Sequence, residues 1–142
     1  IQMHLLLLLF LAAFSAASYA QKNDSFSIVG QWQIQGDEDE GSMSLDSLGF
    51  FYFITEEMTM GGDSFMIDGS LATISYQVVD STSPKQIIVT LINWDENETK
   101  IMRGIFKVID QNTIKMYLNT EDETQPSKFY EDDSPIFKRI TN

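Results

Sequence analysis

The sequence contains no cysteine, and its single histidine, His4, lies among the first 20 residues. Without cysteine the chain can form no disulfide and offers no thiolate as a nucleophile or metal ligand. Beyond residue 20 the usual general base and the nitrogen ligand of zinc are missing as well. A serine in this part of the chain has no histidine partner for a catalytic triad. We therefore expect a protein that is not an enzyme and that binds no cofactor.

Basic residues are also scarce. Nine Lys and Arg stand against 21 Asp and Glu, which gives a formal net charge of −12, and all of these charges follow residue 20. Nucleic acids and anionic membrane surfaces bind clustered basic residues. The composition therefore predicts no nucleic-acid partner.

The acidic residues leave two other kinds of site to consider. Paired carboxylates can support glycoside hydrolysis, but here they cluster in predicted turns. Calcium prefers several oxygen ligands on one loop, yet the acidic runs 37–40, 95–98 and 131–133 do not match the EF-hand pattern. Solvated loops are the favoured interpretation of such runs, and we expect no metal site.

An apolar run from Leu5 to Phe14 is followed by small residues and by Ser18-Tyr19-Ala20. This is the pattern of a secretory signal peptide, residues 1–20, with cleavage between Ala20 and Gln21. The run is shorter than the roughly 20 apolar residues of a membrane-spanning helix. We expect a secreted or periplasmic protein that is not inserted in a membrane after cleavage. A buried core helix is the alternative interpretation of the run.

Residues 21–142 show short segments of period-2 alternation separated by turn residues, the pattern of an all-β sandwich or barrel. In the first segment Ile28, Gly30, Trp32 and Ile34 share one face. The segments 36–44 and 120–134 are predicted to be loops. The predicted strands are Ile28–Gln35, Phe50–Ile54, Glu57–Met60, Ser64–Asp68, Ser70–Val79, Gln86–Asn93, Ile101–Ile109, Thr113–Asn119 and Pro135–Ile140.

Eight or nine short strands in simple succession favour one domain folded as an antiparallel up-and-down β-barrel. Closure of the sheet removes the exposed edges that promote aggregation. A Greek-key sandwich has the same local pattern and is the structural alternative.

Three short motifs carry a resemblance to a known family: Ile28-Val29-Gly30-Gln31-Trp32, Gly104-Ile105-Phe106 and Phe137-Lys138-Arg139. In these residues the chain resembles the small exported lipocalin-like domains of bacteria, part of the lipocalin superfamily. The resemblance implies a barrel in which Gly30 allows close passage of the chain, Trp32 plugs the floor and Arg139 lies over its indole ring. A guanidinium stacked on tryptophan contributes about 0.5–2 kcal/mol.

The apolar residues of the predicted strands are candidates for the lining of a cavity. Binding of a small apolar or amphipathic ligand is the expected function, and methionine suits an adaptable pocket. The same side chains could instead fill the barrel, in which case the protein would act through its surface as an interaction or inhibitory module. The candidate ligand-binding residues are Phe51, Phe53, Met58, Met60, Tyr76, Phe106 and Met116.

Overall fold

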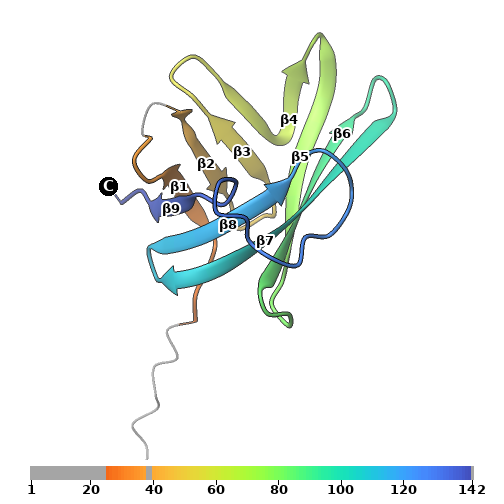
Figure 1. The fold of residues 1–142 in the computed structure, drawn as a ribbon. Helices are drawn as coiled ribbons and strands as arrows, with labels where there is room; N and C mark the ends of the chain where they lie inside the picture. Colours follow the sequence, from red (N-terminus) through yellow and green to blue (C-terminus); the bar gives the residue numbers. More distant parts are fainter. Residues whose placement is uncertain (1–24, 38–39, 142) are drawn as a thin grey trace, which may run out of the picture.

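The computed structural model describes residues 25–37 and 40–141, so the predicted signal peptide lies outside the described residues. Its nine strands are β1 (Gly30–Ile34), β2 (Ser42–Leu45), β3 (Phe51–Ile54), β4 (Thr59–Ile67), β5 (Ser70–Val79), β6 (Lys85–Asn93), β7 (Glu98–Asp110), β8 (Thr113–Asn119) and β9 (Ile136–Arg139) (Figure 1). Within the same residues no helix is long and apolar enough to cross a membrane.

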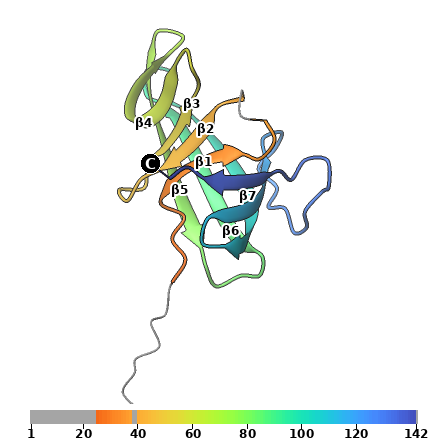
Figure 2. The same ribbon diagram turned by 90° about the vertical axis from the view of Figure 1, so that its left-hand side faces the viewer.

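The strands form one closed ring in which every neighbour is antiparallel. Consecutive strands pair in chain order, and β9 pairs back on β1 through Trp32 and Arg139, Gln33 and Lys138, and Ile34 and Phe137. Figure 2 shows β9, in dark blue, beside β1, in orange. The predicted up-and-down barrel is confirmed, and a sandwich of two separate sheets is excluded.

Two strands differ from the prediction. Residues 42–44 were expected to be part of an acidic loop but belong to β2, which pairs with β1 and β3. Residues 57–60 and 64–68 were expected to be two strands but belong to β4, which continues through Gly61 and Gly62. The expected number of strands was thus right, although one strand was missed and another was counted twice.

The strand β4 bends sharply at Gly61-Gly62 and changes its neighbour there. Residues 59–61 pair with β3, and residues 62–67 pair with β5. Beside this elbow Phe50, the residue before β3, forms an antiparallel bridge directly with Ser75 of β5. An odd number of strands cannot alternate up and down around a closed ring. The elbow resolves the conflict, because the two arms of β4 run in opposite directions (Figure 1).

Side chains that point into the ring form the core. Strand residues alternate between the two faces of a sheet, and the inward set is almost fully buried. It comprises Trp32, Met43, Leu45, Phe51, Ile74, Ile87, Val89, Phe106, Ile114 and Met116. The predicted inward position of Trp32 is confirmed, since its side chain has an exposed fraction of 0%.

A second packed region lies outside the barrel. Ile105 follows the outward alternation of β7 but is only 1% exposed. The connection 120–134 runs across β7 and β8 there (Figure 1). The Gln125 side-chain amide donates to the Gly104 carbonyl oxygen at 3.0 Å, and the Tyr117 and Tyr130 rings meet edge to face with centroids 5.4 Å apart. This predicted polar loop therefore packs as a cover on the sheet.

Candidate functional site

The floor of the barrel is formed around Trp32. Its cross-strand partner is Arg139, whose guanidinium carbon lies 4.3 Å from the centroid of the indole ring. The indole nitrogen donates a hydrogen bond of 2.9 Å to the carbonyl oxygen of Ile28. A buried tryptophan needs such a partner for its N–H group. The ring is therefore packed, stacked and fully hydrogen-bonded at one end of the barrel.

Arg139 connects the last strand to two other parts of the chain, the segment before β1 and the turn between β7 and β8. Its terminal nitrogens donate to the carbonyl oxygens of Val29 at 2.6 Å and Ser27 at 2.7 Å. Its Nε and one terminal nitrogen donate to the Gln111 carbonyl oxygen at 3.2 and 3.1 Å. Gly30 has a φ of +147°, and a Cβ on it would lie 2.5 Å from an Arg139 nitrogen. Glycine is thus required where the guanidinium crosses the chain.

Phe26 also belongs to the floor, although it was not among the predicted site residues. Its ring centroid lies 6.1 Å from that of Trp32 and 6.4 Å from that of Phe106. The Arg139 guanidinium carbon is 6.0 Å from the Phe26 ring. Phe26 lies two residues before Ile28, so it continues the alternation of Ile28, Gly30 and Trp32, and extending that pattern by one step would have found it.

Replacement of Arg139 by lysine is expected to lower the free energy of unfolding by about 1–2 kcal/mol. Lysine keeps the charge but cannot place donors at three carbonyl oxygens at once. The matched control is Arg103→Lys, because no side-chain hydrogen bond is formed by Arg103 among the described residues; a change below about 0.5 kcal/mol is expected there. Urea unfolding followed by circular dichroism measures both. Equal losses would show that the guanidinium contacts do not stabilise the floor.

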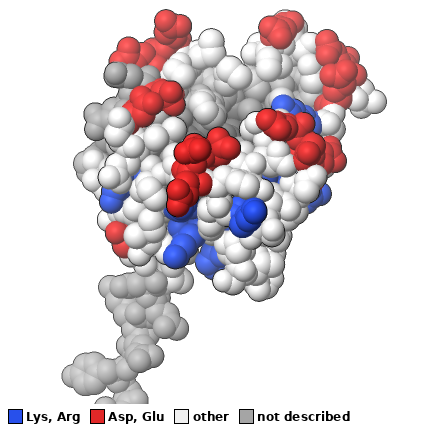
Figure 3. Space-filling view, viewed as in Figure 1, with Lys and Arg blue, Asp and Glu red and all other residues white. Residues whose placement is uncertain are grey.

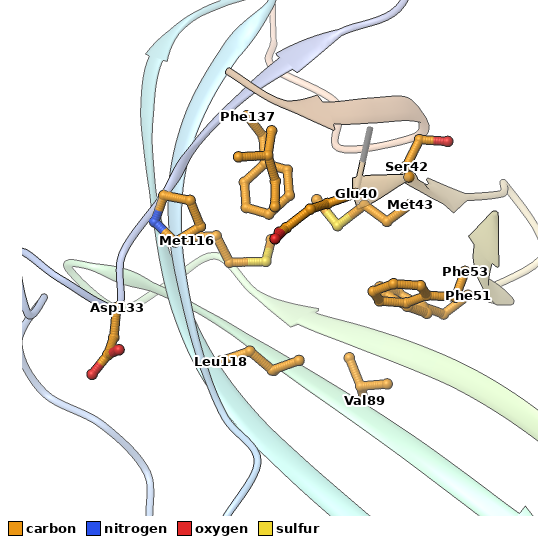
Figure 4. Close-up of a pocket in the computed structure, with 13 residues that line it drawn as sticks. Glu40, Ser42, Met43, Phe51, Phe53, Val89, Met116, Leu118, Asp133 and Phe137 are labelled. Carbon is orange, nitrogen blue, oxygen red and sulfur yellow. The ribbon is translucent and has the colours of Figure 1, made fainter. Parts of the chain in front are cut away.

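A cavity of about 220 Å³ lies on the other side of the Trp32 layer. Ile34 follows Trp32 on the inward face of β1, and its cross-strand partner Phe137 lies beside it on β9. Both side chains line the cavity. The lining is mostly apolar and comprises Ile34, Glu40, Gly41, Ser42, Met43, Phe51, Phe53, Val89, Met116, Leu118, Asp133, Pro135 and Phe137 (Figure 4).

Three of the predicted ligand-binding residues, Phe51, Phe53 and Met116, line this cavity. Phe51 and Met116 are buried, whereas Phe53 is 51% exposed. The rings of Phe51 and Phe53 lie 6.4 Å apart, and Figure 4 shows them together on β3, facing the cavity. These aromatic side chains form one wall.

The other four predicted residues lie outside the cavity. Met58 is exposed in the turn before β4, and Met60 pairs with Phe53 on the first arm of that strand. Phe106 packs on Phe26 in the floor. The Tyr76 hydroxyl donates to the Asp46 carbonyl oxygen at 2.6 Å. Burial, and secondarily the nearby Asp46 charge, raises the pKa of Tyr76.

Several lining residues were not expected. Met43 and Ser42 belong to β2, the strand missed in the sequence, although Met43 and Leu45 alternate with two serines. Val89 and Leu118 lie in predicted strands, but alternation alone does not distinguish a residue that lines the cavity from one that fills the core. That distinction depends on the height of each residue in the barrel, which is set by the register between strands.

Among residues 25–37 and 40–141, no group of three or more His, Cys, Asp or Glu side chains could hold a metal ion. No protein-family model, no curated protein and no solved structure matches this chain.

Proposed function

We propose that this protein is an exported lipocalin-like carrier that binds a small apolar or amphipathic molecule in the cavity above Trp32. The observation that carries the proposal is an apolar cavity at one end of a closed barrel whose other end is sealed. The closed antiparallel barrel is compatible with a lipocalin-like fold. The contact between Trp32 and Arg139 supports the same assignment. The signal-peptide pattern of residues 1–20 supports export.

The size of the cavity sets the class of ligand. An apolar cavity of about 150 Å³ accommodates benzene, whereas pockets for drug-sized ligands span about 300–1,000 Å³. A cavity of about 220 Å³ therefore fits a ring system of one or two rings, or the end of an acyl chain. A longer ligand would extend past Phe53, whose side chain is half exposed.

A second candidate function is surface recognition, and an exposed apolar patch favours it. Met66 pairs with Leu71 across β4 and β5, and the Trp94 amide donates to the Leu71 carbonyl oxygen at 2.8 Å. The exposed fractions of Met66 and Trp94 are 62% and 56%. We define these three residues as the outer patch. Exposed apolar groups that lie together are typical of contact sites.

The carrier function is tested with naphthalen-2-ylmethanol, a neutral two-ring probe, by isothermal titration calorimetry on residues 21–142. We expect one site with a Kd of roughly 0.1–1 mM, the range for a ligand with about a dozen heavy atoms. Leu118→Trp places a large ring in the cavity and is expected to weaken binding more than tenfold. Met116→Trp is a second cavity-filling variant from the buried wall.

The matched control is Met66→Trp, which adds the same ring in the outer patch and is expected to leave the Kd unchanged. Circular dichroism establishes that each variant is folded. If the probe does not bind, or if it binds equally well to the cavity-filling variants, the carrier function is wrong. Loss of binding in Met66→Trp alone would move the site to the outer patch.

A further inference from the structure

Two carboxylates lie at the edge of the otherwise apolar cavity. Glu40 comes from the connection between β1 and β2, and Asp133 from the connection before β9. Both residues are exposed although they line the cavity, which places them at its mouth. Figure 4 shows the Glu40 side chain extending toward the side chains of Met43, Met116 and Phe137. A molecule in the cavity would therefore meet a carboxylate where it emerges.

No positive charge compensates these two groups at the mouth. The lining contains no Lys, Arg or His. In the part of the chain that the structure describes, the one ion pair within 4 Å joins Lys85 and Asp80, at the start of β6. Glu40 and Asp133 thus have no cationic partner among the described residues.

The charged residues of the whole barrel are also distributed unevenly between its two ends. On the face shown in Figure 3, Asp and Glu predominate in the upper part of the view, toward the β4–β5 and β6–β7 turns (Figure 1), and most Lys and Arg lie lower, nearer the floor. Arg139 and Lys138 lie in the last strand, which ends at the floor. An acidic opening with a cationic base attracts positive ligands toward the mouth and repels anions.

We propose that the cavity selects cationic amphiphiles, with the apolar part among Phe51, Val89 and Met116 and an ammonium group at the mouth beside the Glu40 carboxylate (Figure 4). Asp133 adds a second negative charge at the edge of the same cavity. The proposal rests on the carrier function and specifies its ligand class. Phe53 and Phe137 at the same end add aromatic faces, which attract ammonium groups. A fatty acid would bring its carboxylate to two others and is disfavoured.

Three probes with the same ring system test this selection: naphthalen-2-ylmethylamine, naphthalen-2-ylmethanol and naphthalene-2-carboxylate. At low ionic strength we expect the amine to bind about tenfold more tightly than the alcohol and the carboxylate to bind more weakly than both. Two charges separated by a few ångströms near a protein surface suffice for a tenfold effect. The preference should decline in 0.5 M salt because exposed charges are screened.

The double variant Glu40→Gln, Asp133→Asn assigns the effect to these residues. When both probes are measured on this variant, the Kd of the amine is expected to lie within about twofold of the Kd of the alcohol. Glu123→Gln is the control for a loss of negative charge away from the cavity, and it should retain most of the preference.

The outcomes separate this inference from the function on which it rests. If none of the probes binds, the carrier function itself fails. If the alcohol binds and the amine binds no more tightly, the carrier function stands and the cationic selectivity is wrong. If the double variant keeps the full preference for the amine, the general field of the protein is responsible and the assignment to Glu40 and Asp133 is overturned.

Discussion

Replacement of Trp32 by alanine is expected to lower the free energy of unfolding by about 3–5 kcal/mol, the range for removal of a buried aromatic side chain. The side chain is fully buried and pairs with Met43 on one side and Arg139 on the other. Its loss leaves a void that the closed ring cannot collapse to fill, and it removes the aromatic face under the guanidinium. For a domain of this size, whose total stability is of order 5–15 kcal/mol, such a loss is a large fraction.

The second tryptophan supplies the matched control. Trp94 is 56% exposed on the outside of the barrel, and Trp94→Ala is expected to cost less than about 1 kcal/mol. Trp32→Phe keeps most of the packing but loses the hydrogen bond to the Ile28 carbonyl oxygen, so an intermediate loss of about 1–2 kcal/mol is expected. Urea unfolding followed by far-ultraviolet circular dichroism compares all three. Similar losses for Trp32→Ala and Trp94→Ala would contradict the assignment of Trp32 as the floor.

The second large effect is expected for Gly61→Ala, at about 2–4 kcal/mol. Gly61 has a φ of +119°, a conformation that L side chains rarely adopt. A Cβ on it would overlap the carbonyl oxygen of Phe51 on β3. The new methyl group therefore strains its own backbone and also pushes β3 away from β4. Overpacking of this kind costs about 1–3 kcal/mol beyond the backbone strain.

Gly69 separates the two contributions. It has a φ of +81°, and a Cβ on it would meet nothing within 4 Å. Gly69→Ala is expected to cost only about 1–2 kcal/mol, from backbone strain. The difference between the two variants in urea unfolding reports the steric contribution at the elbow. If Gly61→Ala costs no more than Gly69→Ala, β4 does not need a close approach to β3 at this point.

Trp32→Ala and Gly61→Ala should also differ in their effect on ligand binding. Trp32 does not line the cavity, whereas the elbow determines where β3 lies, and β3 carries the lining residues Phe51 and Phe53. Displacement of this wall would alter the shape of the cavity. The elbow is thus the part of the fold that couples barrel closure to the proposed binding site.

Local alternation explains why most of the strands could be predicted from the sequence. In β5 and β6 each inward residue is followed by an outward one over nine or more positions, and this signal does not depend on the rest of the fold. β2 has only four residues beside an acidic run, too few for a pattern to be separated from a loop. Its pairing with β1 and β3 decides its conformation.

The path of β4 shows the opposite case. A pair of glycines within alternating residues marks a turn or a break in most sequences, and two strands were expected here. The ring instead requires one strand that pairs with β3 and then with β5. This requirement follows from closure of the whole barrel and is not present in any local segment.

The sequence by itself determined the fold class, the closing pair Trp32 and Arg139, and the acidic character of the protein, because alternation, short motifs and charge are properties of the chain. Tertiary structure alone decided which apolar side chains line the cavity and which fill the floor. Tyr76 and Met116 have the same apolar, inward pattern, yet only Met116 faces the cavity. The reason is that strand register and tilt set the height of each residue within the ring, and these are fixed by pairing with strands far away in the sequence.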